Sequence, residues 1–141
     1  MKRFAALIFS FALVPVGHTS ATPQSSTLDD AKSQAAAGNL DRAVQLFQQV
    51  LKEDADNIVA LRGLADALVA EGRWPTAIEP LQHLDQLEPN DAARVFQLGQ
   101  MESWQSGHRG HALALLKRAT ELDPSNLPYR KYYAQALSWN A

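Results

Sequence analysis

The chain has 141 residues, enough for one domain, and its 13 basic and 15 acidic residues nearly balance. The basic residues form no stripe of the kind that binds nucleic acid, so we expect no nucleic-acid partner. There is no cysteine, which excludes disulfide bonds and a lipid anchor attached through cysteine, so the core must rest on packing alone.

The first 21 residues have the pattern of a secretory signal peptide. Two basic residues precede an apolar run over residues 4–14, and small residues at 19–21 predict cleavage after Ala21. The run is too short for a comfortable transmembrane helix, although an uncleaved N-terminal anchor is the alternative. We therefore expect an exported protein, periplasmic or secreted, with no stable membrane insertion after cleavage of the signal.

Residues 22–27 are rich in Pro, Ser, Thr and Gln, a composition that predicts a short disordered lead-in. The first helix is expected from about Leu28 to Ala37, with Ser26 or Thr27 as its cap. A turn leads to a second helix, whose apolar stripe consists of Leu40, Ala43, Val44, Phe47, Val50 and Leu51. Residues 28–57 are thus expected to form a helix pair whose polar leading helix suits the end of a stack.

Residues 58–91 show the same pattern more strongly. Apolar residues recur at i, i+3, i+4 and i+7 in the first half of this unit, at Leu61, Leu64, Ala65 and Leu68. Gly72 permits a turn, Pro75 fits the first turn of the following helix, and Pro89 stops that helix. Two antiparallel helices of this length cannot bury their apolar faces alone, whereas stacking on like pairs can bury them.

The pattern recurs over residues 92–126, and its first half returns over residues 127–141 as a final helix. Pro89 and Pro124, which end successive units, lie 35 residues apart, and a repeat period in this range is typical of stacked helix pairs. The final helix has two interpretations. It is a terminal solvating helix, or the chain is the front of a longer repeat protein, which the many aromatic residues of that helix favour.

The central unit resembles a tetratricopeptide repeat. The residues that carry the resemblance are Leu61, Leu64-Ala65, Leu68, Gly72, Trp74, Ala77, Leu81, Leu84 and Pro89. The unit departs from the family's pattern where Leu61 replaces the usual Trp, Leu68 the usual Tyr and Leu84 a small residue. The resemblance implies an all-α, right-handed α-solenoid of three helix–turn–helix units plus a single C-terminal helix.

In that family the leading helices line a concave groove that binds a protein or peptide partner. The resemblance implies that the groove residues here include Arg62, Asp66, Phe96, Gln97, Gln100, Trp104, Lys131, Tyr132 and Gln135. Alternatively, Phe96 and Trp104 pack against the next unit and bind nothing. One subgroup of the family grips a C-terminal carboxylate with several basic and amide residues. Of the matching positions here only Lys32 is basic, so we do not expect that activity.

No motif predicts catalysis or a cofactor. His108 and His111 stand three residues apart, but a metal site needs three or four ligands, and only Glu102 lies near them in sequence. The glycines at 107 and 110 lack the preceding strand and the following Lys of a phosphate loop. With no cysteine nucleophile and no Ser motif in a strained turn, we expect neither an enzyme nor a cofactor.

The sequence therefore predicts an exported scaffold that binds a protein or peptide through the groove, by analogy within an assembly of the cell envelope. In a first alternative, the chain is the N-terminal repeat part of a larger secreted or outer-membrane protein, for example in polysaccharide export, whose activity lies beyond Ala141. In a second, it is a metal-binding accessory protein acting through His108 and His111. The sequence leaves the oligomeric state open.

Overall fold

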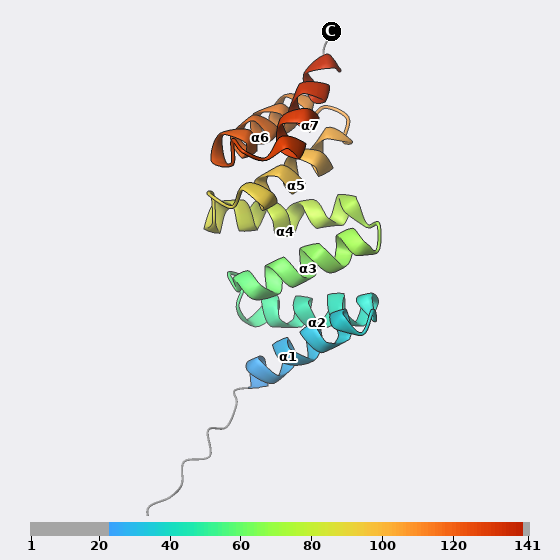
Figure 1. Cartoon of the computed structure of the whole chain (residues 1–141). Helices are drawn as coiled ribbons and strands as arrows, with labels where there is room; N and C mark the ends of the chain where they lie inside the picture. The colour runs from blue at the N-terminus through green and yellow to red at the C-terminus, as the bar shows by residue number, and fades with distance from the viewer. Residues whose placement is uncertain (1–22, 140–141) are drawn as a thin grey trace, which may run out of the picture.

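The computed structural model describes residues 23–139, which form seven α-helices and no strand (Figure 1). The helices are α1 (Pro23–Ala36), α2 (Leu40–Glu53), α3 (Ile58–Ala70), α4 (Trp74–Leu87), α5 (Ala92–Ser103), α6 (Arg109–Leu122) and α7 (Leu127–Ser138). Figure 1 shows them stacked in chain order, which confirms the all-α array of three helix pairs and a final helix. The expected signal peptide, and residues 140–141 of the expected final helix, lie outside the described residues. None of the described helices is long and apolar enough to cross a membrane.

The predicted disordered lead-in is wrong for residues 23–27, because α1 begins at Pro23. Pro suits the first turn of a helix, where its missing N–H has no intrahelical partner. Ser26 and Thr27, expected as caps, therefore lie inside the helix. A polar Ser/Thr/Gln composition is compatible with a helix as well as with disorder. Packing favours the helix here, because Ala31 in the same helix is fully buried.

The helix boundaries follow from local capping signals. Asn57, Asp91 and Asn126 precede α3, α5 and α7, and the side-chain oxygen of each accepts a hydrogen bond from the backbone N–H three residues later. The turns inside the three pairs contain glycines at positive φ, a conformation that strains other residues: Gly38, Gly72 and Gly107. Each pair is thus a leading helix, a glycine turn and a trailing helix.

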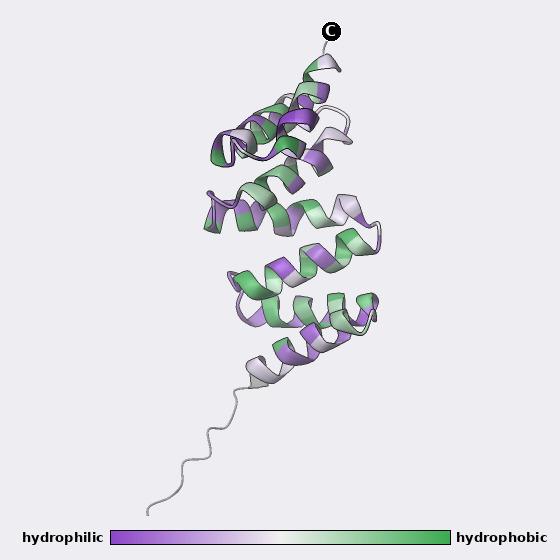
Figure 2. Cartoon of the chain, in the orientation of Figure 1, coloured by the Kyte–Doolittle hydropathy of each residue, from purple (hydrophilic) through white to green (hydrophobic). Residues whose placement is uncertain are grey.

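Each leading helix inside the stack lies between two trailing helices. Helix α3 packs against α2 and α4, and α5 packs against α4 and α6, whereas α1 packs chiefly against α2. Leucines on the predicted stripes face these neighbours, and Leu64, Leu81, Leu98 and Leu116 are all buried. In Figure 2 green apolar and purple polar segments alternate along most helices, as expected when one face of each helix is buried.

A glycine in α3 lets the first two units approach closely. A Cβ atom built on Gly63 would lie 2.2 Å from Cζ of Phe47, so the ring of Phe47 lies directly against the backbone of α3. Phe47 is itself only 2% exposed, so its ring is surrounded by other protein atoms. The contact therefore requires a residue without a side chain at position 63.

The last helix is attached through stacked aromatic rings. Phe96 of α5 stacks on Tyr129 with ring centroids 4.3 Å apart, and the edge of Tyr132 meets Phe96 at 5.5 Å. The hydroxyl groups of Tyr132 and Ser103 also lie within hydrogen-bond distance, at 3.3 Å. Burial raises the pKa of Tyr129, and the carboxylates of Asp123 and Asp91 raise it further.

We predict that Gly63→Ala destabilises the fold by about 1–3 kcal/mol, because the added methyl group overlaps the ring of Phe47. Urea denaturation followed by circular dichroism measures the change. The matched control is Gly110→Ala, at a helical glycine with nothing within 4 Å of the new Cβ atom. The control should be as stable as the wild type or up to about 1 kcal/mol more stable. Equal free energies of unfolding for the two variants would contradict the close approach of α2 and α3.

A second prediction concerns alkaline pH. A raised pKa means that the folded state favours the neutral phenol of Tyr129, so the stability it contributes is complete below the unfolded pKa of about 10. That contribution is lost as the pH rises through the folded pKa. Tyr129→Phe keeps the ring beside Phe96, and it should lose less stability than the wild type between about pH 9 and pH 11. Equal losses, measured by urea denaturation at each pH, would show that Tyr129 does not contribute.

Candidate functional site

Three of the predicted groove residues meet in one hollow between α3 and α5. The hollow has a volume of ≈ 530 Å³, and its lining consists of Arg62, Asp91, Ala93, Arg94, Gln97 and Gln100. Arg62 projects from α3, Asp91 is the cap of α5, and the other four residues lie on the first two and a half turns of α5. The sequence predicted Arg62, Gln97 and Gln100 for this groove, and the structure places them together.

Two arginine networks border the hollow between α3 and α5. Arg62 donates from Nε to Glu88 Oε2 at 3.1 Å and from Nη2 to Asp91 Oδ2 at 3.0 Å. Arg94 donates from Nη2 to Asp66 Oδ2 at 3.1 Å, so the fourth predicted residue borders the same hollow. The Arg94 network joins the third unit to the second, whereas Arg62 of α3 binds the two acids of the turn between α4 and α5. Asp66 is largely exposed, which limits the free energy of its pair to roughly 0–1 kcal/mol.

The electrostatics of the hollow are nearly balanced. The hydrogen bond to Asp66 raises the pKa of Arg94, whereas burial lowers it. The negative charges of Asp66, Asp91 and Glu88 raise the pKa of Arg94 further. Arg94 is therefore a permanent cation held by acidic neighbours. It also donates from Nη1 to the side-chain oxygen of Gln97 at 3.0 Å, which orients that amide. The hollow thus presents oriented guanidinium and amide groups, which bind carbonyl and carboxylate oxygens.

The aromatic residues predicted for the groove serve other contacts. Phe96 and Tyr132 meet each other in the packing of α7 on α5. Trp104 caps the end of α5 and contacts Trp74 at the start of α4, with ring centroids 4.6 Å apart. Trp104 remains 53% exposed and borders a separate hollow at the turn before α6. The structure therefore places Trp104 beside the preceding unit.

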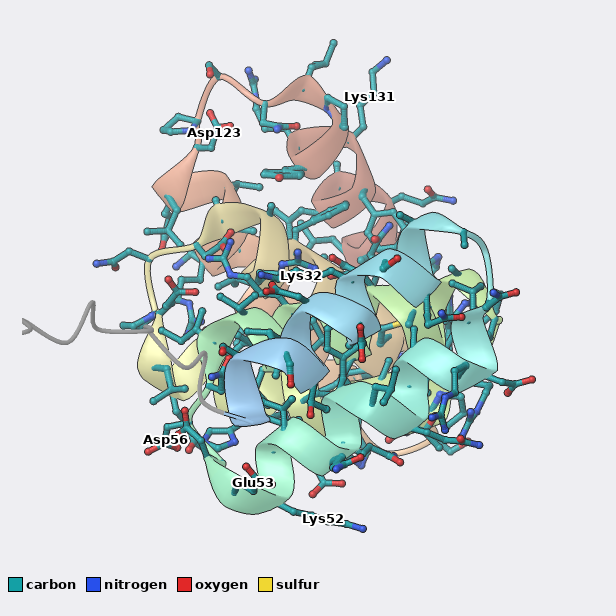
Figure 3. All side chains as sticks on the ribbon, turned by 90° about the horizontal axis from the view of Figure 1, so that it is seen from below. Lys32, Lys52, Glu53, Asp56, Asp123 and Lys131 are labelled. Carbon is teal, nitrogen blue, oxygen red and sulfur yellow. The ribbon has the colours of Figure 1, made fainter. Side chains whose placement is uncertain are left out.

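The remaining predicted residues lie on α7. Lys131 and Gln135 are both exposed, and Lys131 lines a different hollow together with Leu127 and Tyr133. Figure 3 shows Lys131 projecting outward from α7, far from Lys52, Glu53 and Asp56 at the other side of the molecule. The structure thus brings Arg62, Asp66, Gln97 and Gln100 together and leaves the residues of α7 apart from them.

Glu102 is a buried acid whose environment the sequence did not reveal. It is 0% exposed, Gln82 of α4 donates to its Oε1 at 2.9 Å, and Nδ1 of His111 shares a hydrogen bond with its Oε2. Nδ1 of His108 lies 3.9 Å from the same oxygen. Across residues 23–139, however, no three His, Cys, Asp or Glu side chains are placed to hold a metal ion. Two signals were available: Glu102 lies near His108 and His111 in sequence, and it lies 34 residues after Leu68, which is also buried.

Three members of the arginine networks, Glu88, Asp91 and Arg94, were not predicted for the groove. Their partners lie 26 to 29 residues away, a separation at which sequence spacing alone does not predict pairing. The repeat period places α3 beside α5, and opposite charges on the two facing helices would have been the signal to follow.

Comparison with known proteins agrees with this architecture. Residues 34–100 match a family model described as tetratricopeptide repeat. No curated protein matches the chain in sequence.

Solved structures of low sequence identity share the fold. A MamA chain from Desulfovibrio magneticus RS-1 has a TM-score of 0.72 at 20% identity, with 83% of this chain and 66% of that chain covered. The match therefore spans slightly less than two thirds of that MamA chain. The first repeat domain of Spaghetti (RPAP3), bound to an HSP90 peptide, has a TM-score of 0.67 at 17% identity, covering 82% of this chain and 93% of that one.

The Yersinia enterocolitica type III secretion chaperone SycD, in complex with a peptide of the translocator YopD, also shares the fold. Its TM-score is 0.62 at 19% identity, with 86% of this chain and 92% of that chain covered. Residues 34–100 thus match the tetratricopeptide repeat family, and the chain as a whole shares the helical-repeat fold of these solved structures.

Proposed function

We propose that the protein is a scaffold that binds a protein or peptide segment in the hollow between α3 and α5. The observation that carries this proposal is that ion pairs already orient two arginines lining the hollow, Arg62 with Asp91 and Arg94 with Asp66. A binding site that is ordered on folding loses less entropy when its partner arrives. The proposal assigns no catalytic activity to the protein.

The chemistry of the hollow favours an extended peptide with a polar backbone contact. Gln97 and Gln100 each offer one amide donor group and one acceptor, which match the N–H and C=O groups of a peptide bond. Arg62 and Arg94 already engage acidic side chains, so their charges are largely compensated. The hollow therefore suits a neutral peptide stretch better than a strongly acidic one. Two solved proteins of the same fold, described above as peptide complexes, support this class of partner.

Binding should depend on the amide groups of the hollow. We expect the Gln97→Ala/Gln100→Ala variant to bind about 5- to 150-fold more weakly to peptides selected from a displayed library against the wild-type protein. The loss of two hydrogen bonds at about 0.5–1.5 kcal/mol each accounts for this factor. Fluorescence polarisation with the selected peptides measures it. The matched control is Gln86→Ala, which removes an exposed amide from α4, outside the hollow.

Trp104→Ala separates ligand binding from packing in the same assay. The ring contact with Trp74 contributes about 0.5–1.5 kcal/mol beyond its buried area, so this variant should be less stable than the wild type. It should nevertheless bind the selected peptides with unchanged affinity, because Trp104 does not line the hollow. The proposal is contradicted if the glutamine double variant retains full affinity while Trp104→Ala loses it.

We further propose that the scaffold acts outside the cytoplasm, in an assembly of the cell envelope. The signal-like pattern of residues 1–21 supports this location. The protein isolated from the periplasmic or secreted fraction of its native cells should begin at Thr22. N-terminal sequencing and intact mass measure this, and a protein that retains Met1 and stays in the cytoplasm would overturn the proposed location without affecting peptide binding.

A further inference from the structure

One face of helix α7 is exposed along most of the length of the helix. Leu127 and Leu137 are 53% and 49% exposed, and the two residues between them on the stripe, Arg130 and Ala134, are exposed as well. These four residues follow the spacing i, i+3, i+7 and i+10, so they share one face of the helix. Figure 1 shows α7 at one end of the stack, next to α6.

The equivalent faces of the other leading helices are covered. One unit earlier, Val95, Gly99 and Glu102 occupy the positions of Arg130, Ala134 and Leu137, and all three are buried. Their cover is the trailing helix α6. A Cβ atom on Gly99 would lie 3.0–3.2 Å from atoms of Leu115 and Leu116, and Glu102 bonds His111.

The same holds two units earlier. In α3 the equivalent residues are Leu61, Ala65 and Leu68, with exposures of 3%, 0% and 2%, and α4 is the trailing helix that packs against α3. The register of the repeat therefore identifies the open stripe of α7 as the face that a trailing helix covers in the second and third units.

We propose that this face of α7 binds an amphipathic, acidic helix of a partner protein, in the place that α4 and α6 take against α3 and α5. The charge of α7 specifies the acidic character. Arg130 and Lys131 are exposed on the helix, both line the hollow beside Leu127, and Leu127–Ser138 contains no acidic residue. The same two cations repel a second copy of α7, which disfavours face-to-face pairing of two chains. This surface is separate from the hollow between α3 and α5.

The test uses a stapled 14-residue helix, the length of α4 and of α6, as a fluorescent probe of the full chain. Stapling is needed because an isolated helix of this length is only marginally stable. The probe carries a Leu/Ala stripe flanked by Glu. One comparison peptide has every Glu replaced by Lys, and a second has the same composition in an order that destroys the stripe. Fluorescence polarisation measures the affinity of each.

The proposal predicts that the acidic probe binds at least tenfold more tightly than either comparison peptide. Leu127→Ser/Leu137→Ser should weaken that binding at least tenfold, and Gln97→Ala/Gln100→Ala should leave it unchanged. Arg130→Glu/Lys131→Glu should reverse the preference toward the Lys peptide, which keeps the test decisive should the leucine variant not fold.

Three results would overturn the proposal. The first is an absence of binding by the acidic probe, and the second is equal binding of the acidic and basic peptides. The third is a dimer in sedimentation that Leu127→Ser/Leu137→Ser abolishes, because this would assign the face to a second copy of the chain. None of these results bears on the hollow between α3 and α5, which the glutamine variant tests separately.

Discussion

The packing of each leading helix between two trailing helices is the constraint on which the rest of the structure depends. A single pair of short amphipathic helices has too little apolar surface to stay folded, so the units share one continuous interior. Small residues in the leading helices make the close approach possible. Gly63 receives the ring of Phe47 from the preceding unit, and Gly99 receives Leu115 and Leu116 from its own. These contacts set how closely α2 packs on α3 and α6 packs on α5.

The two binding surfaces arise from the same repeat in different ways. The hollow lies where two complete units meet, and they are bridged there by the pair of Arg94 with Asp66. The stripe on α7 lies where a leading helix has no trailing helix within the described residues. The first surface is polar and charge-balanced, whereas the second is mostly apolar, with Arg130 inside the stripe and Lys131 beside it. A scaffold built in this way can hold two chemically different segments at once.

Much of the fold was predictable, because apolar stripes, glycine turns and a constant repeat period can be recognised in the sequence itself. The start of α1 could not be predicted, because the polar residues after Pro23 are compatible with both helix and disorder. The burial of Ala31, which favours the helix, is seen only in the structure. The family resemblance also predicted that Arg62 and Gln97 face the groove. It does not tell whether a neighbouring helix covers a given side chain, so the packing of Phe96 and the burial of Glu102 required the structure.

Native-state amide hydrogen exchange, read helix by helix, tests the shared interior most directly. If each helix is stabilised by its neighbours on both sides, the amides of α3, α4 and α5 should exchange most slowly. Those of α1 and α7, which lie at the two ends of the described stack, should exchange faster by a factor that grows toward the ends. Amides in α1 or α7 that exchange as slowly as those in α3 would contradict the account, because the end helices would then owe their stability to something other than stacking.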